Sequence, residues 1–598
     1  MSRPWARFDD LRTGTALRCP PPFRVLAGER PEDVPAILRQ VDEATAEGSW
    51  AFGYVAYEAA AALDPKLPGG WQPGQPPLIW FGLCDEPARV EPVRPEESSA
   101  SRVTSWRPTW SDAEHASAVA CVREHIAAGE TYQCNLTDRM RATLTETPEA
   151  LYTRLALAQR GAYNAYLDLG EHVIASASPE LFFEWADSEV RTRPMKGTAP
   201  RGRTIAEDAR QSRALRTNSK EQAENLMIVD LLRNDLGRIA EHGSVRVDEL
   251  FTLERYPTVW QLTSQVSARL PPGTGLLDIF RALFPCGSVT GAPKRRTMQL
   301  ISELEPGPRG VYCGAIGLVA PPTAPVRARF SVAIRTAFVD RMSGRAVYGV
   351  GGGITWGSEP GPERAEVHAK AAVLAHDSGD HQLLESMAFH PLTGLRNHAR
   401  HLARMADSAA WFGFSFDQDT VQNRIQRALE GRTEPTCVRV LLGRTGDVTV
   451  DVQDLEPVIA RPVLLAVDDE PVDRRSAWLQ HKTTRRDPYL TRTLRHPDAD
   501  DVVLVNEDGD ITETTVATLA VRLGGRWWTP PTSSGCLPGV ERARLLDLGR
   551  LQERRLHVRD LREAEAIAVV SSLQGWRQAL LLGSVAGVAG TGRKVVRR

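Results

Sequence analysis

Apolar residues recur at helical spacing in several stretches of the chain. Over 219–241 they occupy positions 226, 229, 232 and 236, which places them on one face of an amphipathic helix. The same kind of pattern predicts helices in three further segments (34–48, 361–374 and 395–414). The alternating apolar run 330–336 is typical of a strand, and Asp508-Gly509 predicts a hairpin turn between two further strands.

A short polar segment, HDSGDH at 376–381, is predicted to link two bodies of sequence. The first covers 1–375, with an N-terminal region over 1–110 and a motif-rich core over 111–375; the second covers 382–598. Residues 86–110 are rich in proline, serine and charge and are expected to form an exposed connection. A length of 598 residues exceeds a single hydrophobic core and suggests roughly three to five domain-sized units. The two bodies of sequence on either side of the polar segment predict two enzymes on one chain.

The composition of the chain mainly excludes classes of function. The 73 basic and 75 acidic residues nearly cancel, so no overall basic field favours nucleic acid or a membrane surface. We find no run of about 18 apolar residues and no signal-peptide pattern at the start, and we expect a cytoplasmic location. The eight cysteines are scattered without a C-x-x-C pair, which argues against zinc and disulfide frameworks.

Two of the predicted helices carry paired carboxylates. Glu221 and Glu224 share one face of the first helix, Glu363 and Glu366 have the same spacing on the second, and Lys370 follows one turn later. Two such pairs suit Mg²⁺, a hard cation that binds few carboxylates and keeps several waters. The alternative for either pair alone is a solvated helix face.

Between these helices lie features suited to an anionic ligand. The triplet Gly351, Gly352 and Gly353 allows backbone amides to approach such a ligand closely. Arg335 lies in the predicted strand 330–336, where an unpaired guanidinium would be costly, so we expect a carboxylate partner. A structural salt bridge is the alternative role for Arg335.

The segments over about 111–375 together resemble the chorismate-utilising family, which includes anthranilate, aminodeoxychorismate, isochorismate and salicylate synthases. The resemblance implies an α+β domain of two facing antiparallel sheets flanked by helices, with the site between them. Glu224 and Glu366 would bind Mg²⁺, with Glu221 and Glu363 as supporting carboxylates. Further substrate-binding residues carried over from the family are Thr198, Tyr312, Arg335, the 351–353 backbone and Lys370.

Lys196, in Pro-Met-Lys-Gly-Thr, bears on which product such an enzyme makes. Anthranilate synthases usually have alanine at this position and aminodeoxychorismate synthases have lysine. By that resemblance Lys196 would attack C2 of chorismate while the C4 hydroxyl leaves, and ammonia would then add at C4 and expel the lysine. Glu180 matches the family's general acid. Gln261 stands where many relatives have histidine, which places more of the proton transfer on Glu180.

The chain has no G-x-C-x-G nucleophile elbow with downstream His and Glu, so its own sequence offers no source of ammonia. We therefore expect a separate glutamine amidotransferase subunit as a partner.

The second body carries Lys482 in QHKTTRRDPYL, Glu513 after the predicted hairpin, and Arg404 on the helix over 395–414. In order and spacing these resemble the fold-type-IV pyridoxal-phosphate enzymes, which include branched-chain and D-amino-acid aminotransferases and aminodeoxychorismate lyase. By that resemblance Lys482 would hold the cofactor covalently, and Glu513 would pair with its pyridine nitrogen. Arg404, with the backbone of Gly539 and Val540 at a helix start, would bind its phosphate.

Two residues depart from the fold-type-IV pattern. Thr518 replaces a common asparagine, and Glu541 stands where a phosphate-binding threonine is usual. The resemblance also implies a two-subdomain α+β domain with the cofactor in its cleft, and a homodimer through 382–598.

The fusion connects the two resemblances. The product of an aminodeoxychorismate synthase is the substrate of an aminodeoxychorismate lyase, so we predict a bifunctional enzyme that converts chorismate and ammonia to 4-aminobenzoate. Alternatives remain open: an anthranilate synthase-like domain fused to an amino-acid transaminase, or a degenerate, structural pyridoxal-phosphate domain. The role in folate synthesis or in secondary metabolism is likewise open.

Overall fold

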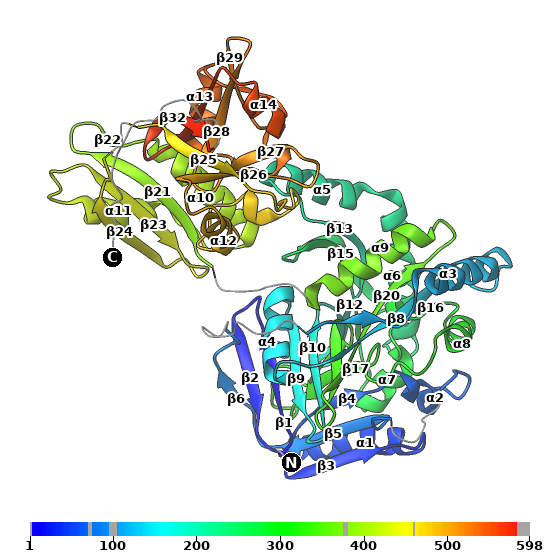
Figure 1. The fold of residues 1–598 in the computed structure, drawn as a ribbon. Coiled ribbons are helices and arrows are strands. Elements are labelled where there is room, and N and C mark those ends of the chain that lie inside the picture. The colour runs from blue at the N-terminus through cyan, green and yellow to red at the C-terminus, as the bar shows by residue number, and fades with distance from the viewer. Residues whose placement is uncertain (1–2, 70–74, 95–103, 375–380, 458–460, 583–598) are drawn as a thin grey trace. The chain divides into compact units, whose positions relative to one another are not determined.

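The computed structural model describes residues 3–69, 75–94, 104–374, 381–457 and 461–582 (Figure 1). Its contacts divide the chain into two compact units, Met1–Arg201 with Arg210–Gly379 and Gly202–Ala209 with Asp380–Arg598. The linker predicted at 376–381 lies outside the described residues except for His381. Each unit is described by itself below.

The first unit is built on two antiparallel sheets. The first sheet has the strand order β16 (Gly291–Ala292), β8 (Gln133–Thr143), β20 (Arg345–Ile354), β19 (Thr336–Asp340), β10 (His172–Ser178), β9 (Tyr163–Asp168), β1 (Trp5–Asp10), β2 (Thr15–Cys19) and β6 (Ala88–Val90), with β7 (Arg107–Pro108) beside β8. The second has the order β13 (Met195–Pro200), β15 (Val259–Arg269), β12 (Glu189–Arg193), β11 (Leu181–Ala186), β18 (Ala328–Val332), β17 (Ala315–Val319), β4 (Trp50–Val55), β5 (Ile79–Cys84) and β3 (Arg24–Gly28), with β14 (Arg246–Arg255) beside β15.

The two sheets face each other across a buried layer that includes Phe52 and Tyr54 from one and Leu167 and Ile174 from the other. Helices cover the outer faces, with α4 packed on β10 and α9 on β20 (Figure 1). The helices of this part of the chain are α1 (Asp33–Ala46), α2 (Ala60–Leu63), α3 (Asp112–Ala127), α4 (Pro148–Gln159), α5 (Ile205–Thr217), α6 (Ser219–Gly237), α7 (Leu276–Leu283), α8 (Lys294–Leu304) and α9 (Pro360–Ala371). The predicted fold class, α+β with facing antiparallel sheets, is confirmed.

The second unit contains two sheets. The smaller one, β22 (Gly394–Leu395), β21 (Leu383–His390), β23 (Thr436–Leu442) and β24 (Val448–Asp454), is covered by α10 (His398–Phe412) and α11 (Gln418–Leu429). The larger has the order β27 (Ile511–Thr514), β26 (Asp501–Val505), β25 (Val463–Val467), β32 (Gly575–Leu581), β31 (Ala566–Ser571), β28 (Thr518–Leu523), β29 (Arg526–Thr529) and β30 (Gln552–Glu553). Its helices are α12 (Asp487–Arg495), α13 (Val540–Asp547) and α14 (Val558–Arg562).

The sequence patterns are matched in most places. The predicted helix over 219–241 is α6, where Val229, Leu232 and Leu236 are buried and Leu226 is exposed. The predicted hairpin is formed by β26 and β27, with Gly509 at a φ of 81°, a conformation that favours glycine. Within the predicted connection over 86–110, the described residues include β6 and β7.

The strand predicted over 330–336 is wrong at its end. Strand β18 stops at Val332, and Arg335 occupies a bend with a φ of 53° before β19 begins. Its guanidinium donates to the carbonyl of Lys370, where we expected a carboxylate partner. The left-handed turn directs the side chain toward the end of α9, which the local alternation of apolar residues could not reveal.

Among the described residues, none of the helices combines the length and the hydrophobicity that a bilayer-spanning segment needs.

Candidate active sites

Lys196 lies on the edge strand β13, facing both α6 and β20. Its Nζ is 3.5 Å from Glu224 Oε2 on α6, and both side chains are mostly buried. A Cβ at Gly353 would collide with the same amine, so the absence of a side chain there makes room for it. The backbone of β13 is fixed by Asn225, whose amide donates to the Lys196 carbonyl at 3.2 Å. Lys196 therefore sits where α6, β13 and β20 meet.

Glu180 is the buried carboxyl of this site. It follows β10, is 2% exposed, and accepts a hydrogen bond from Ser288 Oγ at 2.6 Å. Burial raises the pKa of Glu180 to about 7, although its hydrogen bonds to Ser288 and to the Met195 amide, and the charge of Lys196, oppose that rise. A carboxyl group with this pKa exchanges protons near neutral pH, as a general acid requires.

The two predicted carboxylate pairs lie on α6 and α9. Burial and the neighbouring Glu224 raise the pKa of Glu221, and Glu366 on the other helix adds to that rise. Burial raises the pKa of Glu363 as well, and its Oε2 is buried without a hydrogen-bond partner in the described part of the chain. Burial also acts on Glu366, but Lys370, 2.7 Å away, together with Lys196 and Arg335 outweighs it and lowers the pKa.

These residues fit a magnesium ion in part. No group of three potential ligands lies within reach of one ion among the described residues. Mg²⁺ commonly binds through one or two carboxylates and takes its remaining ligands from water and substrate, and the unpartnered oxygen of Glu363 is suited to such a cation or to its water shell. The four carboxylates, drawn from two helices, are thus compatible with a Mg²⁺ site completed by substrate.

The glycine triplet lies on β20, opposite residues 135–137 of β8. Lys370 Nζ donates to the Gly351 carbonyl at 2.8 Å, and Glu363 lies beside Gly352, 3.3 Å from where a Cβ would stand. Arg335 reaches the same region through its bond to the Lys370 carbonyl. Lys370 therefore connects the predicted glycine, carboxylate and arginine features at the end of α9.

Tyr312 and Thr198 flank this region. The ring of Tyr312 packs against Gly349 on β20, where a Cβ would collide with it. Thr198 Oγ1 donates to Gln261 Oε1 at 3.1 Å across β13 and β15, so the residue that replaces the family's histidine positions Thr198.

Sequence reasoning missed Gln133. Its side chain is fully buried on β8, close to the Cβ position of Gly353, and neither its amide nitrogen nor its oxygen has a partner among the described residues. Two unpaired buried polar atoms beside Lys196 mark a group that awaits a ligand. A glutamine in a strand pattern carries no such signal in the sequence, because only the sheet pairing brings it to β20.

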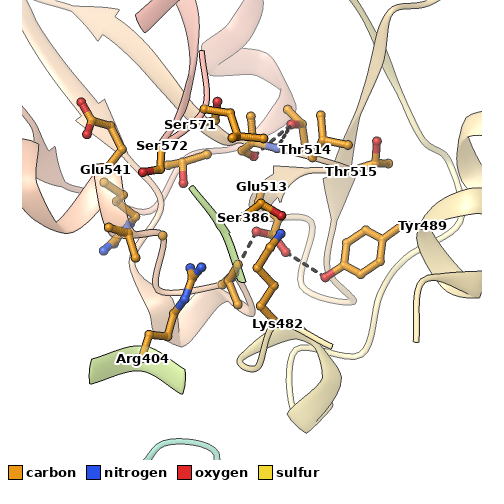
Figure 2. Close-up of a pocket in the computed structure, with 18 of the residues that line it drawn as sticks. Ser386, Arg404, Lys482, Tyr489, Glu513, Thr514, Thr515, Glu541, Ser571 and Ser572 are labelled. Atoms are coloured by element: carbon orange, nitrogen blue, oxygen red, sulfur yellow. Dashed lines mark hydrogen bonds between the residues drawn. The ribbon is translucent and has the colours of Figure 1, made fainter. Parts of the chain in front are cut away.

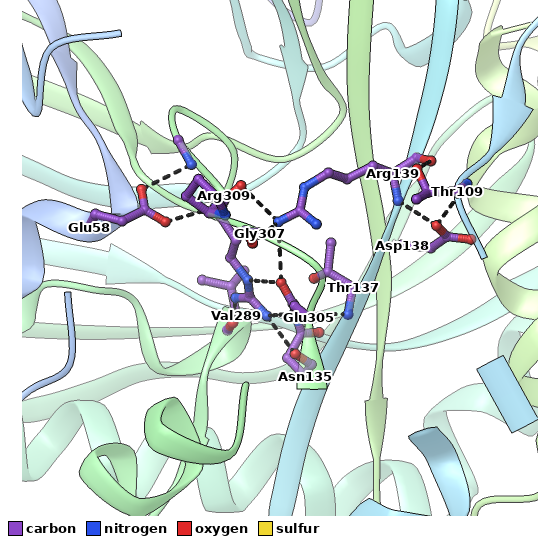
Figure 3. Close-up of polar contacts among 12 residues, drawn as sticks. Glu58, Thr109, Asn135, Thr137, Asp138, Arg139, Val289, Glu305, Gly307 and Arg309 are labelled. Atoms are coloured by element: carbon purple, nitrogen blue, oxygen red, sulfur yellow. Dashed lines mark hydrogen bonds and ion pairs between the residues drawn. The ribbon is translucent and has the colours of Figure 1, made fainter. Parts of the chain in front are cut away.

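A buried ionic network supports the floor of the first site (Figure 3). Arg309 makes a two-pronged ion pair with Glu305, at 2.6 and 3.1 Å, and donates to the carbonyls of Asn135 and Val289. Glu58 accepts from the amides of Arg309 and Gly310 at 2.7 and 2.9 Å. The network therefore ties β8 to the turn that carries Tyr312.

The second site is a cavity of about 270 Å³ in the second unit (Figure 2). Lys482 projects into it, and the backbone carbonyl of Lys482 accepts a hydrogen bond from the Leu384 amide on β21 at 2.9 Å. Burial lowers the pKa of Lys482 to about 8, and the neighbouring Arg404 contributes. Glu513, on β27, accepts from Tyr489 Oη at 3.0 Å and from the Leu537 amide at 3.1 Å, and burial raises its pKa to about 7.

Arg404 lies on α10 at the other end of this cavity, but its guanidinium is already engaged. It forms a bidentate pair with Glu385 at 2.7 and 2.8 Å, and this pair together with His401 lowers the pKa of Glu385 to about 2 despite burial. His401 in turn lies 2.7 Å from Ser572 Oγ. Ser571 and Ser572 also line the cavity and were missed by sequence reasoning; only the fold brings them beside the start of α13.

Gly539 and Val540 form the start of α13, as predicted. A Cβ at Gly539 would approach Thr518 Oγ1 to 2.7 Å, so Thr518 packs directly behind the turn. Glu541 accepts from Arg396, Asn397 and Arg544, and Figure 2 shows its carboxylate directed away from Lys482. Neither departure from the family pattern obstructs the cavity.

The donor set of this cavity fits pyridoxal phosphate. An amine and a buried carboxyl face each other at its centre (Figure 2), and the start of α13, which has no side-chain cap, lies at one end, where two serine hydroxyls offer further donors. Lys482 would hold the cofactor, Glu513 its ring nitrogen, and the turn at Gly539 its phosphate.

Comparison with known proteins identifies two domains. The family model described as chorismate binding enzyme matches residues 28–376, and the amino-transferase class IV model matches residues 382–581. The chain is 39% identical over 300 residues to an aminodeoxychorismate synthase component 1 from Klebsiella aerogenes, which covers 50% of this chain and 65% of that protein. It is 43% identical over 272 residues to an anthranilate synthase component 1 from Streptomyces coelicolor, covering 45% and 52%.

Among solved structures, anthranilate synthase component I from Streptococcus pneumoniae superposes with a TM-score of 0.53 at 26% identity, over 62% of this chain and 92% of that one. The chain spans less than two thirds of the length of the curated relatives it matches. The chorismate binding model covers more than half of the chain. The chain therefore belongs to the chorismate binding enzyme family, and a class IV aminotransferase domain follows it.

Proposed function

We propose that the chain makes 4-aminobenzoate from chorismate and ammonia in two reactions, one in each domain. The observation that carries the proposal is the position of Lys196, whose amine lies 3.5 Å from Glu224 where α6 and β13 meet Gly353. An amine here is suited to covalent chemistry with the substrate, and the relatives named aminodeoxychorismate synthase support that choice.

In the first reaction Lys196 attacks C2 of chorismate, the ring double bonds shift, and the C4 hydroxyl leaves as water with the proton of Glu180. Ammonia then adds at C4, the double bonds shift back, and Lys196 is released; Glu180 regains a proton. The pKa of about 7 of Glu180 supports both roles near neutral pH. Gln133 lies beside the same space, and its donor and acceptor atoms have no hydrogen-bond partner among the residues that the structure describes.

Two sets of residues would hold the substrate. Glu224 and Glu366 would bind Mg²⁺, with Glu221 and Glu363 in support, and a bound cation would offset the negative charge of the ring carboxylate. Tyr312 and Arg335 hold the enolpyruvyl carboxylate, and Thr198, Lys370 and the 351–353 backbone complete the pocket. The ammonia comes from a separate glutamine amidotransferase subunit, in keeping with relatives named as component 1.

In the second reaction Lys482 is the base. Pyridoxal phosphate, when bound, supplies an electron sink that acidifies the C4–H bond beside the amine. Lys482 takes the C4 proton, the C3–O bond breaks with release of the enolate of pyruvate, and the ring becomes aromatic. The enolate takes up one proton, equivalent to the one that Lys482 removed, and becomes pyruvate. Glu513 keeps the ring nitrogen protonated, Arg404 with Gly539 and Val540 fixes the phosphate end, and a homodimer through 382–598 completes the domain.

The test is incubation of the purified protein with chorismate, ammonium, Mg²⁺ and pyridoxal phosphate, followed by chromatography. We expect 4-aminobenzoate and pyruvate in equal amounts. Fluorescent anthranilate as the product would overturn the proposal and support an anthranilate synthase. The chain is also similar in sequence to such an enzyme, the anthranilate synthase component 1 from Streptomyces coelicolor. Amino-group transfer from D-alanine or a branched-chain amino acid to 2-oxoglutarate would identify the second domain as a transaminase. Failure to bind the cofactor would identify that domain as structural.

A further inference from the structure

The cavity of the second unit contains a guanidinium that forms no ion pair with a described carboxylate. Four arginines line it. Arg404 is paired with Glu385 and Arg542 with Glu553, and Arg485 lies over the ring of Trp478. Arg486 also lines the cavity, and in the described part of the chain it forms no ion pair. A partly buried guanidinium without a counter-charge is costly, so an anionic ligand at this position would be favoured.

Arg486 is held in place by contacts other than an ion pair, although its charge also interacts at longer range with the Glu513 carboxyl. Its guanidinium stacks on the ring of Tyr489, 4.2 Å from the centroid, and donates to the carbonyl of Thr515. The ring is itself fixed, because Tyr489 Oη donates to Glu513 at 3.0 Å. One backbone carbonyl occupies little of a guanidinium that carries five N–H donors, so donors remain for a ligand.

Arg486 lies away from the end of the cavity where Arg404 and the turn at Gly539 would bind the cofactor phosphate. Figure 2 shows Tyr489, on which Arg486 stacks, on one side of Lys482, whereas Arg404 and Ser572 lie on the other side. The charges of Arg486 and Lys482 interact, since Arg486 contributes to the lowered pKa of that lysine. An anion bound at Arg486 would therefore lie close to the reacting amine but apart from the phosphate.

We propose that Arg486 binds a carboxylate of the substrate and so selects a carboxylated amine for the second reaction. This inference rests on the proposed function, in which the substrate carries one ring carboxylate and one enolpyruvyl carboxylate. The planar fork of arginine matches a carboxylate through two parallel hydrogen bonds, which a lysine cannot reproduce. The ring carboxylate remains in 4-aminobenzoate, so the product itself probes the contact.

The experiment compares Arg486→Met and Arg486→Lys with the wild-type holoenzyme. The matched control is Arg526→Met, which removes an exposed arginine of the β29 hairpin. Titration with 4-aminobenzoate, and separately with aniline, is followed by the absorbance of the bound cofactor. Steady-state assays with aminodeoxychorismate then give KM and kcat for each variant.

We expect Arg486→Met to weaken 4-aminobenzoate binding and to raise KM by about 10- to 100-fold, the loss typical of a hydrogen-bonded charged contact. Aniline, which has no carboxylate, should bind the variant and the wild type equally. Arg486→Lys should fall between the two, and Arg526→Met should match the wild type.

Equal 4-aminobenzoate binding and KM in Arg486→Met would overturn the inference. So would a change confined to the pH titration of the cofactor absorbance, because that result would assign Arg486 to the cofactor's ring oxygen. Failure of the proposed function has a different signature, since the wild-type protein would then release no pyruvate from aminodeoxychorismate.

Discussion

The two candidate sites use the same pair of groups, a lysine beside a buried carboxyl, in opposite electrostatic settings. Glu180 and Glu513 both have a pKa raised to about 7 by burial. Lys196, however, lies 3.5 Å from Glu224, in a region with three further glutamates on α6 and α9. Lys482 has no ion pair among the described residues and lies with Arg404 and Arg486 in its cavity.

The difference follows from what each pocket has to receive. In the first site the paired carboxylates of α6 and α9, two of which contact Lys196 and Lys370, are suited to a divalent cation, which would then attract an anionic substrate. An excess of guanidinium and amine groups is complementary to a phosphate and a carboxylate directly. The lysine amine of the first unit, Lys196, is therefore salt-paired and works on a substrate that needs a cation for binding. The lysine amine of the second unit, Lys482, is partly buried without an ion pair among the described residues and lies in a cavity suited to anions.

Removing either lysine should have the largest effect on activity, and the two substitutions should block different reactions. We expect Lys196→Ala to lower 4-aminobenzoate formation from chorismate by more than about 1000-fold, since a nucleophile is lost, while conversion of supplied aminodeoxychorismate stays normal. Lys482→Ala should do the reverse and accumulate aminodeoxychorismate. Chromatography of both reactions, each started from either substrate, measures the effects. Full-rate 4-aminobenzoate formation by either variant would contradict the two-lysine scheme.

How far the sequence predicts each site depends on whether the residues act through local spacing or through the fold. Glu221 and Glu224 share a helix face at a spacing that the sequence displays, and the hairpin before Glu513 is marked by its glycine. Gln133 and Ser288 gave no signal, because β-sheet pairing and the turn after α7 bring them to Lys196 and Glu180 from distant segments.

The same distinction explains where the structure departs from the sequence pattern. Apolar residues alternate around Arg335 and predict a strand, yet the chain turns left-handed at this residue. The phosphate-binding role of Arg404 stays a prediction, and its pairing with Glu385 has no sequence signal because it depends on how β21 packs on α10. Helix and strand periodicity report which face is buried, whereas partners across elements are set by tertiary packing.

Removal of divalent cations should have the next largest effect, and it should inhibit the first reaction but not the second. We expect EDTA to abolish chorismate consumption, because Glu224 and Glu366 cannot hold a dicarboxylate without a cation between them. Pyruvate release from aminodeoxychorismate should stay within about twofold, since the second cavity is already cationic. Added Mg²⁺ should restore the first reaction. Loss of both reactions on chelation, or of neither, would contradict the claim that only the first site needs a divalent cation.

The pH dependence of the first reaction should report Glu180. The group acts as an acid, so it has to be protonated, and its pKa is about 7. At a fixed concentration of free ammonia, kcat/KM for chorismate should therefore fall tenfold per unit as the pH rises above 7. Glu180→Gln should cost about 100- to 10,000-fold and remove this limb. A wild-type profile that stays flat from pH 7 to 9 would show that Glu180 is not the acid.

Ser288 should give the smallest effect and sharpen that assignment. Its hydroxyl donates to Glu180 Oε1 at 2.6 Å and favours the ionised carboxylate, so it lowers the pKa against the effect of burial. We expect Ser288→Ala to move the falling limb upward by about half to one pH unit, which corresponds to one hydrogen bond. Ser288→Thr keeps the hydroxyl and is the matched control. A limb that stays in place in Ser288→Ala, with lower activity at every pH, would mean that the serine supports the turn and does not tune the acid.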